Sequence, residues 1–264
     1  MRRHLGDISM EHYIGIDIGS TSTKCVAVDK IGNILARVVI SSGAGTKADK
    51  KAIERLYDLL KCKQSDCERT IATGYGRMLY SAADDQISEI TCHAKGLHYL
   101  IPEAHTIIDI GGQDLKVICI DTNGVIEQFV MNDKCAAGTG RFLEVMCRVM
   151  NIELSELGEY AEHTTQICTI SNTCTVFAES EVISKLSQGY PIANIVAGVH
   201  DSVARTINGL SRRVKIREKI AITGGGGLNK GLVDALSRNL GQQVMVPDDP
   251  QIVGAFGAAL MAAK

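Results

Sequence analysis

Two short segments of the chain carry the same pattern of aspartate, glycine and lysine. Residues 17–24 read Asp-Ile-Gly-Ser-Thr-Ser-Thr-Lys and residues 109–116 read Asp-Ile-Gly-Gly-Gln-Asp-Leu-Lys, an offset of 92 residues. Each segment follows an apolar stretch and forms a tight turn, in which glycine lets the backbone approach a ligand and point N–H groups at an anion. The repeat predicts two phosphate-binding turns that face each other across a cleft between related halves.

The side chains of these turns suit a nucleotide phosphate and its magnesium ion. Asp17, Asp109 and Asp114 offer the hard oxygen ligands that Mg²⁺ prefers, directly or through water. Gln113 could orient a water for attack on a terminal phosphate, because phosphoryl transfer depends mainly on positioning and charge neutralisation. We therefore expect catalytic roles for Gln113, Asp17 and Asp109. The expected nucleotide contacts are Gly19, Ser20, Thr21, Ser22, Thr23, Lys24, Gly111, Gly112 and Gln113. The alternative for the carboxylates is structural, an Asx-type hydrogen bond within each turn.

A third glycine-rich segment follows the apolar stretch 219–223. Gly224, Gly225 and Gly226 begin a run of four glycines, which loses much backbone entropy on folding. Close approach of a flat ligand such as adenosine would explain the run, so we expect these three residues at the nucleotide. A helix-opening P-loop is excluded, since the chain has no Gly-x-x-x-x-Gly-Lys-Ser/Thr segment.

Two of the nine cysteines differ from the others in their surroundings. Cys135 and Cys174 each precede an apolar stretch with helical spacing, and free N–H groups at a helix start favour a thiolate or an anionic cluster. Thr139 and Thr175 are the expected capping residues. The odd count excludes a complete disulfide set within the chain, so we expect reduced thiols and a reducing, cytoplasmic compartment.

The remaining cysteines are expected mostly in packing roles. Cysteines in apolar stretches behave as small hydrophobic residues, and packing is the default expectation for Cys25, Cys92, Cys119, Cys147 and Cys168. Cys62 and Cys67 lie five residues apart in a polar stretch. A solvated surface pair is the expectation there, and a pair of metal ligands is the alternative.

The elements that must position these residues form two strand-rich units, with most of the helices after the second. Apolar runs and alternation predict strands at 13–18, 24–29, 33–40, 70–73, 106–110, 115–120, 125–131, 219–223 and 243–246. Helical spacing predicts helices at 49–60, 87–100, 139–150, 153–161, 177–188, 192–214, 229–240 and from 252 onward. We expect a flexible tail at 1–9, an N-terminal subdomain at 10–104 with the first turn, and a C-terminal subdomain at 105–264. The last helix is able to pack back on the first subdomain.

Composition excludes several classes of partner. A chain of 264 residues suits two domains. Its 28 Lys and Arg nearly balance 30 Asp and Glu, for a net charge of −2, which offers no bulk field to nucleic acid or an anionic membrane. Trp is absent and aromatic residues make up 4%, which disfavours base stacking. No apolar run approaches the length of a membrane span.

The layout resembles the acetate and sugar kinase, Hsp70 and actin superfamily, an α/β two-lobed fold with duplicated mixed β-sheet subdomains. Two segments narrow the resemblance. Residues 131–142 read Met-Asn-Asp-Lys-Cys-Ala-Ala-Gly-Thr-Gly-Arg-Phe and residues 173–181 read Thr-Cys-Thr-Val-Phe-Ala-Glu-Ser-Glu. Both resemble the signature of the ATP-dependent activators of 2-hydroxyacyl-CoA dehydratases, which share a family with the ATPase subunits of benzoyl-CoA reductases. The resemblance covers the chain from about Tyr13 onward.

The resemblance implies an ATP-hydrolysing homodimer with ATP or ADP, Mg and one [4Fe–4S] cluster between its subunits. Cys135 and Cys174 would be the cluster ligands, and two copies would supply the four thiolates that such a cluster needs. Ferredoxin or flavodoxin would donate the electron and a 2-hydroxyacyl-CoA dehydratase would receive it. Alternatives are a benzoyl-CoA-reductase-type ATPase subunit, a small-molecule kinase of the same fold, or a non-enzymatic assembly protein.

Overall fold

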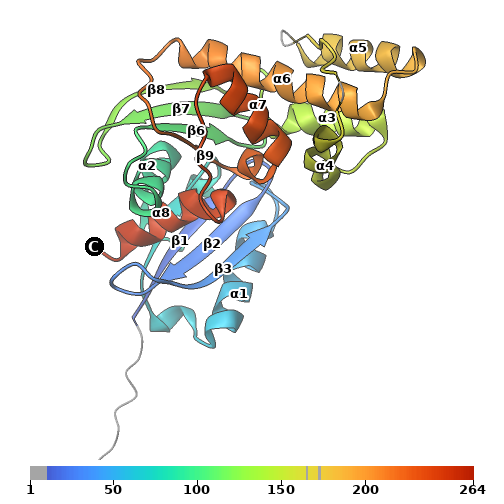
Figure 1. The fold of residues 1–264 in the computed structure, drawn as a ribbon. Helices are drawn as coiled ribbons and strands as arrows, with labels where there is room; N and C mark the ends of the chain where they lie inside the picture. The colour runs from blue at the N-terminus through green and yellow to red at the C-terminus, as the bar shows by residue number, and fades with distance from the viewer. Residues whose placement is uncertain (1–10, 165, 172–173) are drawn as a thin grey trace, which may run out of the picture.

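The computed structural model describes residues 11–164, 166–171 and 174–264 and arranges them in two lobes, each built on one β-sheet (Figure 1). Residues 1–9, expected as a flexible tail, lie outside the described residues. Among the described residues, no helix combines the length and the apolar character that crossing a membrane requires.

The first sheet has five strands in the order β3-β2-β1-β4-β5. Strand β1 pairs antiparallel with β2 and parallel with β4. Helix α1 (Ala48–Leu60) packs Ala52 and Leu56 against this sheet. The strands are β1 (His12–Ile18), β2 (Thr23–Val28), β3 (Ile34–Ile40), β4 (Cys67–Thr73) and β5 (Asp85–Gln86).

The second sheet repeats this topology with four strands in the order β8-β7-β6-β9. Its strands are β6 (Thr106–Ile110), β7 (Leu115–Ile120), β8 (Ile126–Asn132) and β9 (Ile220–Thr223). A large apolar core joins the sheet to the helices beside it, with Phe142, Met146 and Ile195 fully buried. These helices are α3 (Gly140–Met150), α4 (Leu157–Glu162), α6 (Ile192–Ser211) and α7 (Lys230–Leu240). Helix α5 (Thr175–Ser187) lies at the outer end of this lobe (Figure 1).

Two helices are exchanged between the lobes. Helix α2 (Glu89–Leu100) follows the first sheet in the chain but packs Leu97 against the second sheet. Helix α8 (Val253–Ala262) ends the chain but packs Phe256 against β2 of the first sheet. The two helices also pack against each other. The lobes are therefore joined by a helix pair as well as by the chain connections.

Most expected elements form within one to three residues of their predicted bounds. The strand expected at 243–246 is wrong, because only Met245 makes a single bridge, to Ala221. The Val244 amide donates to the Ser237 hydroxyl at 3.1 Å, so that amide is not available to a strand partner. Strand β5 was not predicted, since two residues are too short to show an alternating pattern.

Candidate functional site

Both glycine turns close with the same backbone hydrogen bond. The Gly19 amide donates to the Ser22 carbonyl oxygen, and the Gly111 amide donates to the Asp114 carbonyl oxygen, each at 3.0 Å. The bonded positions are again 92 residues apart in the chain. Each turn joins an antiparallel strand pair, β1–β2 in one lobe and β6–β7 in the other. The sequence repeat is therefore a structural repeat.

Strand register places an aspartate–lysine pair beside each turn. Asp17 lies opposite Lys24 of β2, and Asp109 lies opposite Lys116 of β7. The lysine Nζ lies 3.1 Å from Asp17 Oδ2 in the first pair and 3.2 Å from Asp109 Oδ2 in the second. Both aspartates are buried. Each carboxylate is thus neutralised by a lysine of its own lobe.

A threonine and a glycine complete the repeat on the parallel side of each sheet. Thr73 of β4 lies opposite Asp17, and Thr223 of β9 lies opposite Asp109. The next residues have positive φ, +85° at Gly74 and +79° at Gly224. A side chain on either glycine would collide with the neighbouring aspartate. Glycine is therefore required at both strand ends, for conformation and for space.

The two turns meet between the lobes. A side chain at Gly112 would overlap the hydroxyl of Thr21, so the second turn lies directly against the first. The prediction that the turns face each other is confirmed. A ligand held by both turns would contact both lobes at once, which is the arrangement that a nucleotide-driven movement needs.

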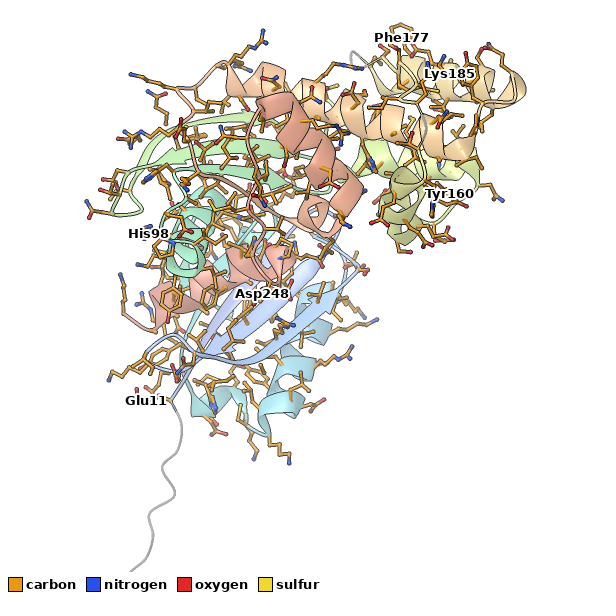
Figure 2. All side chains as sticks on the ribbon, viewed as in Figure 1. Glu11, His98, Tyr160, Phe177, Lys185 and Asp248 are labelled. Atoms are coloured by element: carbon orange, nitrogen blue, oxygen red, sulfur yellow. The ribbon has the colours of Figure 1, made fainter. Side chains whose placement is uncertain are left out.

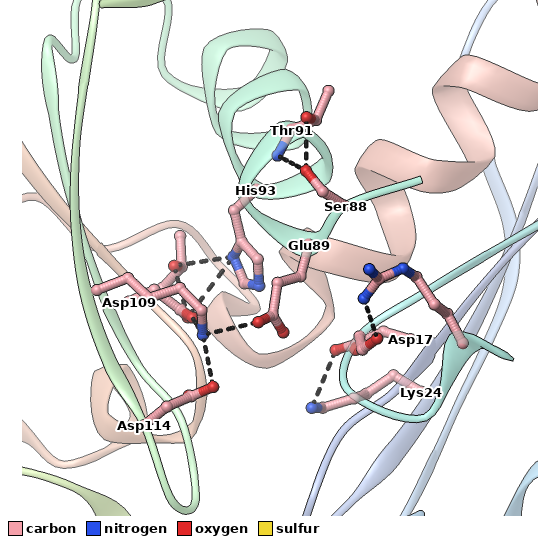
Figure 3. A network of polar contacts seen from close by, with 12 residues as sticks. Asp17, Lys24, Ser88, Glu89, Thr91, His93, Asp109 and Asp114 are labelled. Atoms are coloured by element: carbon pink, nitrogen blue, oxygen red, sulfur yellow. Dashed lines mark hydrogen bonds and ion pairs between the residues drawn. The ribbon is translucent and has the colours of Figure 1, made fainter. Parts of the chain in front are cut away.

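Lys116 contacts three acidic residues, Glu89, Asp109 and Asp114, which Figure 3 labels. Its side chain is 1% exposed, and its Nζ lies 2.9 Å from Asp114 Oδ2, 3.2 Å from Asp109 Oδ2 and 3.4 Å from Glu89 Oε1. Glu89 begins helix α2 and lies between this cluster and Asp17 (Figure 3). One buried ammonium group therefore pairs with three carboxylates. They come from the end of β6, the residue before β7 and the start of α2.

His93, one turn after Glu89 on α2, extends the cluster towards the third glycine motif. Its Nδ1 lies 3.0 Å from the Thr223 hydroxyl, which donates to Asp109 Oδ1 at 2.9 Å. Because Thr223 donates its proton to Asp109, the histidine Nδ1 is the donor to Thr223. A side chain at Gly254 of α8 would contact both His93 Nε2 and Asp17 Oδ2. Helices α2 and α8 thus place residues between Asp109 of the second lobe and Asp17 of the first.

The opposite charges of the cluster stabilise the ionised forms of Asp109 and Lys116. Burial alone raises the pKa of Asp109, but His93, Lys116 and the Thr223 hydroxyl stabilise the carboxylate and bring its pKa well below the usual range. Burial lowers the pKa of Lys116, but the three surrounding carboxylates raise it above the usual range. Burial raises the pKa of Glu89, and Lys116 offsets this only in part. Within one cluster, the pKa of Glu89 is therefore raised and that of Asp109 is lowered.

The three aspartates expected at magnesium do not form a ready-made site. Asp17 pairs with Lys24, whereas Asp109 and Asp114 share Lys116. Among the described residues, the only group of three or more Cys, His and carboxylate side chains close enough to share one cation lies elsewhere. A magnesium role for these aspartates stays a prediction, through water or after the lysines move.

The predicted phosphate contacts differ in how accessible they are. Ser20, Thr21 and Ser22 are partly exposed in the first turn, and Gln113 is exposed in the second. Thr23 is fully buried, and its hydroxyl donates to the Ser42 carbonyl oxygen at 3.0 Å. Gln113 and the three residues before Thr23 are therefore the side chains best placed to reach a phosphate.

The glycine run has a structural reason that the sequence did not reveal. Side chains at Gly224 and Gly226 would collide with Ile110 at the end of β6. Gly225 is exposed, and the nearest atom to a Cβ there would be Gln251 Nε2 at 4.0 Å. The chain itself thus requires Gly224 and Gly226, and Gly225 alone of these three has room for a ligand beside it.

The two selected cysteines both lie at the surface of the second lobe. Cys135 is exposed in the loop between β8 and α3, and Cys174 is partly exposed at the N-cap of α5. The expected caps are wrong in detail. Thr139 occupies the N-cap of α3, but its hydroxyl donates to the Ala136 carbonyl oxygen at 2.8 Å. Thr175 is the first helical residue of α5, with Cys174 as the N-cap. Thr173, in the second cysteine segment, lies outside the described residues.

The start of α3 is bonded to the second glycine turn. The Gly140 amide donates to the Gly111 carbonyl oxygen at 2.9 Å, and the Arg141 amide donates to the Gly112 carbonyl oxygen at 2.8 Å. First-turn amides of a helix have no partner within the helix. Carbonyl oxygens of the turn accept hydrogen bonds from two of these amides. The predicted phosphate loop is therefore bonded directly to the start of α3, which the Cys135 loop leads into.

Comparison with known sequences decides the family. The pattern of the BadF/BadG/BcrA/BcrD ATPase family matches residues 14–262, almost the whole chain. The chain belongs to this family. The membership expected from the two cysteine segments is confirmed, and the chain is an ATPase.

Relatives within the family are similar over nearly their full length. The chain is 49% identical to a 2-hydroxyisocaproyl-CoA dehydratase activator of Clostridioides difficile, with 94% of each protein covered. It is 46% identical to the (R)-2-hydroxyglutaryl-CoA dehydratase activating ATPase of Acidaminococcus fermentans, with 95% of this chain and 96% of that protein covered. A benzoyl-CoA reductase subunit of Thauera aromatica is 32% identical, with 94% of this chain and 92% of that protein covered.

Solved structures confirm the predicted two-lobed fold. The chain matches the activator of the 2-hydroxyisocaproyl-CoA dehydratase from Clostridium difficile with bound ADPNP, at a TM-score of 0.93 and 48% identity over 96% of this chain and 94% of that chain. It matches a ROK family glucokinase from Streptomyces griseus at a TM-score of 0.60 and 13% identity, over 95% and 98%. The second likeness shows the fold alone.

Sequence reasoning missed three residues of the site in this family member. Lys116 ends the second repeat segment, as Lys24 ends the first, so the repeat itself could have assigned it. Glu89 and His93 carry no comparable signal, because they stand in a helix far along the chain from either turn. Their role depends on the packing of α2 against the second sheet.

Proposed function

We propose that this ATPase is an iron–sulfur protein that passes single electrons to a 2-hydroxyacyl-CoA dehydratase and thereby activates it. Identities of 49% and 46% to proteins named as activators of such dehydratases support the proposal. The dehydratase would bind the acyl-CoA. A reduced ferredoxin or flavodoxin would supply the electron, and the two lobes would move against each other as ATP is hydrolysed.

The observation that carries the proposal is the bonding of α3 to the second glycine turn. Gly140 and Arg141 donate their amides to the Gly111 and Gly112 carbonyl oxygens. A movement of this turn as the nucleotide is hydrolysed would therefore shift the start of α3 and the loop that carries Cys135. This gives ATP hydrolysis a direct mechanical route to the redox group.

The cysteines fit a [4Fe–4S] cluster shared between two copies of the chain. Cys135 and Cys174 are free thiols with exposed or partly exposed side chains. Each chain would supply two of the four thiolates, so a twofold axis would have to pass near them. Cys174 at the N-cap of α5 would also benefit from the positive end of that helix. When bound, the cluster would store one electron.

An apolar surface beside Cys174 supports a dimer. Val176 and Phe177, in the first turn of α5, are 64% and 62% exposed, and Ile183 on the same helix is 50% exposed. Phe177 lies on the side of α5 that faces away from the first lobe (Figure 2). Exposed large apolar side chains grouped on one element are typical of an interface. A second copy docked there would bring its own cysteine segment to the same place.

The chain's own residues would bind and position the nucleotide. Ser20, Thr21 and Ser22 would donate to phosphate oxygens, and Gln113 would orient the attacking water. Lys24 would exchange Asp17 for a phosphate, which would free Asp17 to hold magnesium through water. On the other lobe, Lys116 would keep Asp109 and Asp114 charged and in place.

A second candidate function is the ATPase subunit of a benzoyl-CoA-reductase-type enzyme. The 32% identity to the benzoyl-CoA reductase subunit of Thauera aromatica favours it. The higher identity to dehydratase activators places it second. The likeness to a ROK family glucokinase reaches only 13% identity, so the small-molecule kinase has no support beyond a shared fold.

The iron content of protein purified without oxygen tests the proposal. We expect two iron atoms per chain, four per dimer, and ATP-dependent activation of a 2-hydroxyacyl-CoA dehydratase. Cys135→Ser should lose the iron and keep nucleotide binding. Colourless, iron-free protein would overturn the iron–sulfur assignment, and iron retained by Cys135→Ser would remove that residue from the ligand set.

The role of Gln113 is tested separately by hydrolysis. Gln113→Ala should lower the rate of ATP hydrolysis by about 10²–10³-fold, the usual effect of removing one catalytic polar group, and change nucleotide affinity much less. Asn123, which lies on the exposed β7–β8 turn, provides a matched control as Asn123→Ala. Equal hydrolysis rates for Gln113→Ala and the control would exclude this role.

A further inference from the structure

A histidine and two cysteines meet at the far end of the first sheet from the nucleotide turns. His12 begins β1 and Cys67 begins β4, and the two residues are paired in the parallel register. Cys62 follows the end of α1. The nitrogen or sulfur ligand atoms of the three side chains all lie within 4.8 Å of one another. Asp17 is five residues along β1 from His12, about 17 Å away, so this group is separate from the nucleotide site.

We propose that His12, Cys62 and Cys67 form a second metal site, which takes Zn²⁺. One imidazole and two thiols are the donor set that zinc prefers. With Zn–S and Zn–N bonds of about 2.0–2.3 Å, tetrahedral ligand atoms lie about 3.8 Å or less apart. The three atoms need only small side-chain movements from their positions to reach that spacing. Water or another external donor would fill the fourth position.

One ring nitrogen of the histidine lacks a hydrogen bond. The Nδ1 atom of His12 is buried and has no hydrogen-bond partner among the described residues. A buried polar atom without a partner costs about 1–3 kcal/mol. A cation between the histidine and the two thiols would provide that partner, so the arrangement has a physical reason that packing alone does not supply.

The loop between the cysteines is held in shape by its own contacts. The Lys63 amide donates to Asp66 Oδ2 at 2.8 Å, and the Cys67 thiol donates to the Lys63 carbonyl oxygen at 3.7 Å. The Cys62 amide donates to the Tyr57 carbonyl oxygen at the end of α1. Both cysteines are therefore fixed before any ion binds, which lowers the entropy lost on binding.

The cysteines lie among charged side chains of both signs. Lys61 and Lys63 flank Cys62 in the chain, and Asp66 and Glu68 flank Cys67. These charges offset one another, so the three ligand atoms and the unpartnered His12 Nδ1 are what favour a cation here. A solvated pair was the expectation at Cys62 and Cys67. The structure favours the ligand-pair alternative, because it adds His12 from another element.

A cobalt titration of the full chain tests the site. The background carries Cys135→Ser and Cys174→Ser, so that these thiols cannot bind the probe, and the protein is kept reduced by a phosphine. We expect one Co²⁺ per chain, a thiolate-to-cobalt charge-transfer band, displacement by Zn²⁺, and a higher midpoint of thermal unfolding with Zn²⁺. Adding Cys62→Ser and Cys67→Ser should reduce the bound metal from one equivalent to none.

The histidine variant and a matched control make the assignment specific. His12→Gln should lose most of the cobalt affinity, whereas His98→Gln, which removes another partly buried histidine, should keep it. ATP hydrolysis should stay unchanged in both, which also shows that both variants fold. A charge-transfer band that survives Cys62→Ser with Cys67→Ser would overturn the proposal. So would a Cys62–Cys67 disulfide in protein isolated from anaerobic cells, or no cobalt binding at all.

Discussion

Lys116 is the residue on which the charge balance of the proposed nucleotide site depends. Its Nζ contacts three carboxylates, from Asp109, Asp114 and Glu89, at 2.9–3.4 Å. A buried ion pair contributes little net stability compared with apolar packing, but the loss of one partner leaves the other charge buried and unpaired. This lysine is therefore more important for keeping the acidic cluster intact than its single charge suggests.

Lys116→Met is expected to lower the free energy of unfolding by about 3–5 kcal/mol, because three carboxylates lose their buried cation. Chemical denaturation at neutral pH measures the change. The matched control is Lys24→Met at the equivalent position of the first lobe, where, among the described residues, Nζ forms an ion pair with one carboxylate, that of Asp17. The control substitution should lower the free energy of unfolding by less than Lys116→Met does. Equal losses in the two variants would contradict the central role of Lys116.

His200 couples stability to pH from inside the second lobe. Burial lowers its pKa to about 4, and the charge of Arg238 adds to this effect. Asn229 uses its carbonyl oxygen to cap α7 and presents its amide nitrogen to His200 Nε2 at 2.9 Å. His200 Nε2 is therefore an acceptor, and the ring is neutral at pH 7.

Between pH 7 and pH 4 the unfolded chain takes up a proton at this histidine before the folded chain does, because the unfolded pKa is about 6.5. The free energy of unfolding should therefore fall with pH, by about 2 kcal/mol at pH 5 from this residue. His200→Gln should remove that part of the pH dependence. Denaturation curves at pH 7 and pH 5 that show the same loss in both proteins would contradict the assignment.

At the scale of elements, the crossing of α2 and α8 joins the two lobes. A side chain at Gly257 of α8 would overlap the Cys92 carbonyl oxygen of α2, and one at Gly96 of α2 would overlap the Val253 carbonyl oxygen of α8. The helix backbones are therefore in direct contact. Because α2 also carries Glu89 and His93, this crossing sets where both side chains lie in the proposed nucleotide site.

Gly257→Ala should destabilise the protein by about 1–3 kcal/mol, the usual cost of an added methyl group in a tightly packed contact. It should also lower ATP hydrolysis, because α2 must move. Gly209→Ala on α6 is the matched control, since no atom lies within 4 Å of the added Cβ. Alanine there should be neutral or stabilising by up to about 1 kcal/mol. A similar midpoint of thermal unfolding for both variants would show that the crossing tolerates a side chain.

At the scale of the whole molecule, the proposed nucleotide site and the apolar surface of α5 are two separate regions. The first lies between the lobes, whereas the second faces away from the first lobe (Figures 1 and 2). Helix α3 connects the two regions through its bonded start at the second turn. A second copy bound at α5 would therefore leave the space between the lobes open to nucleotide.

Phe177→Asp should turn the proposed dimer into a monomer and remove its iron, because a charge on the apolar face of α5 opposes a second copy. Light scattering with size-exclusion chromatography gives the mass, and an iron assay gives the cluster. Ile31→Asp is the matched control, since Ile31 is 75% exposed on the β2–β3 turn of the other lobe. A dimeric, iron-containing Phe177→Asp protein would contradict the proposed interface.

Most of the elements could be predicted from sequence because their signals are local. The apolar run at 106–110 and the helical spacing at 49–60 each depend on residues within one element. The strand expected at 243–246 failed for a non-local reason, since its pairing with β9 is limited to the two backbone hydrogen bonds of Met245. The capping role expected of Thr139 failed because its hydroxyl reaches back to Ala136, a geometry that residue types do not specify.

The repeated turn, its aspartate and its lysine were determined by the sequence alone, because the eight residues of each hairpin bring Asp17 to Lys24 and Asp109 to Lys116. Only the tertiary structure decided which groups surround them. Glu89 and His93 reach the site through the packing of α2 on the other lobe's sheet. His12 reaches Cys62 and Cys67 through the register of β1 with β4. Such contacts depend on strand pairing and helix crossing between distant segments, and no local pattern of residues encodes them.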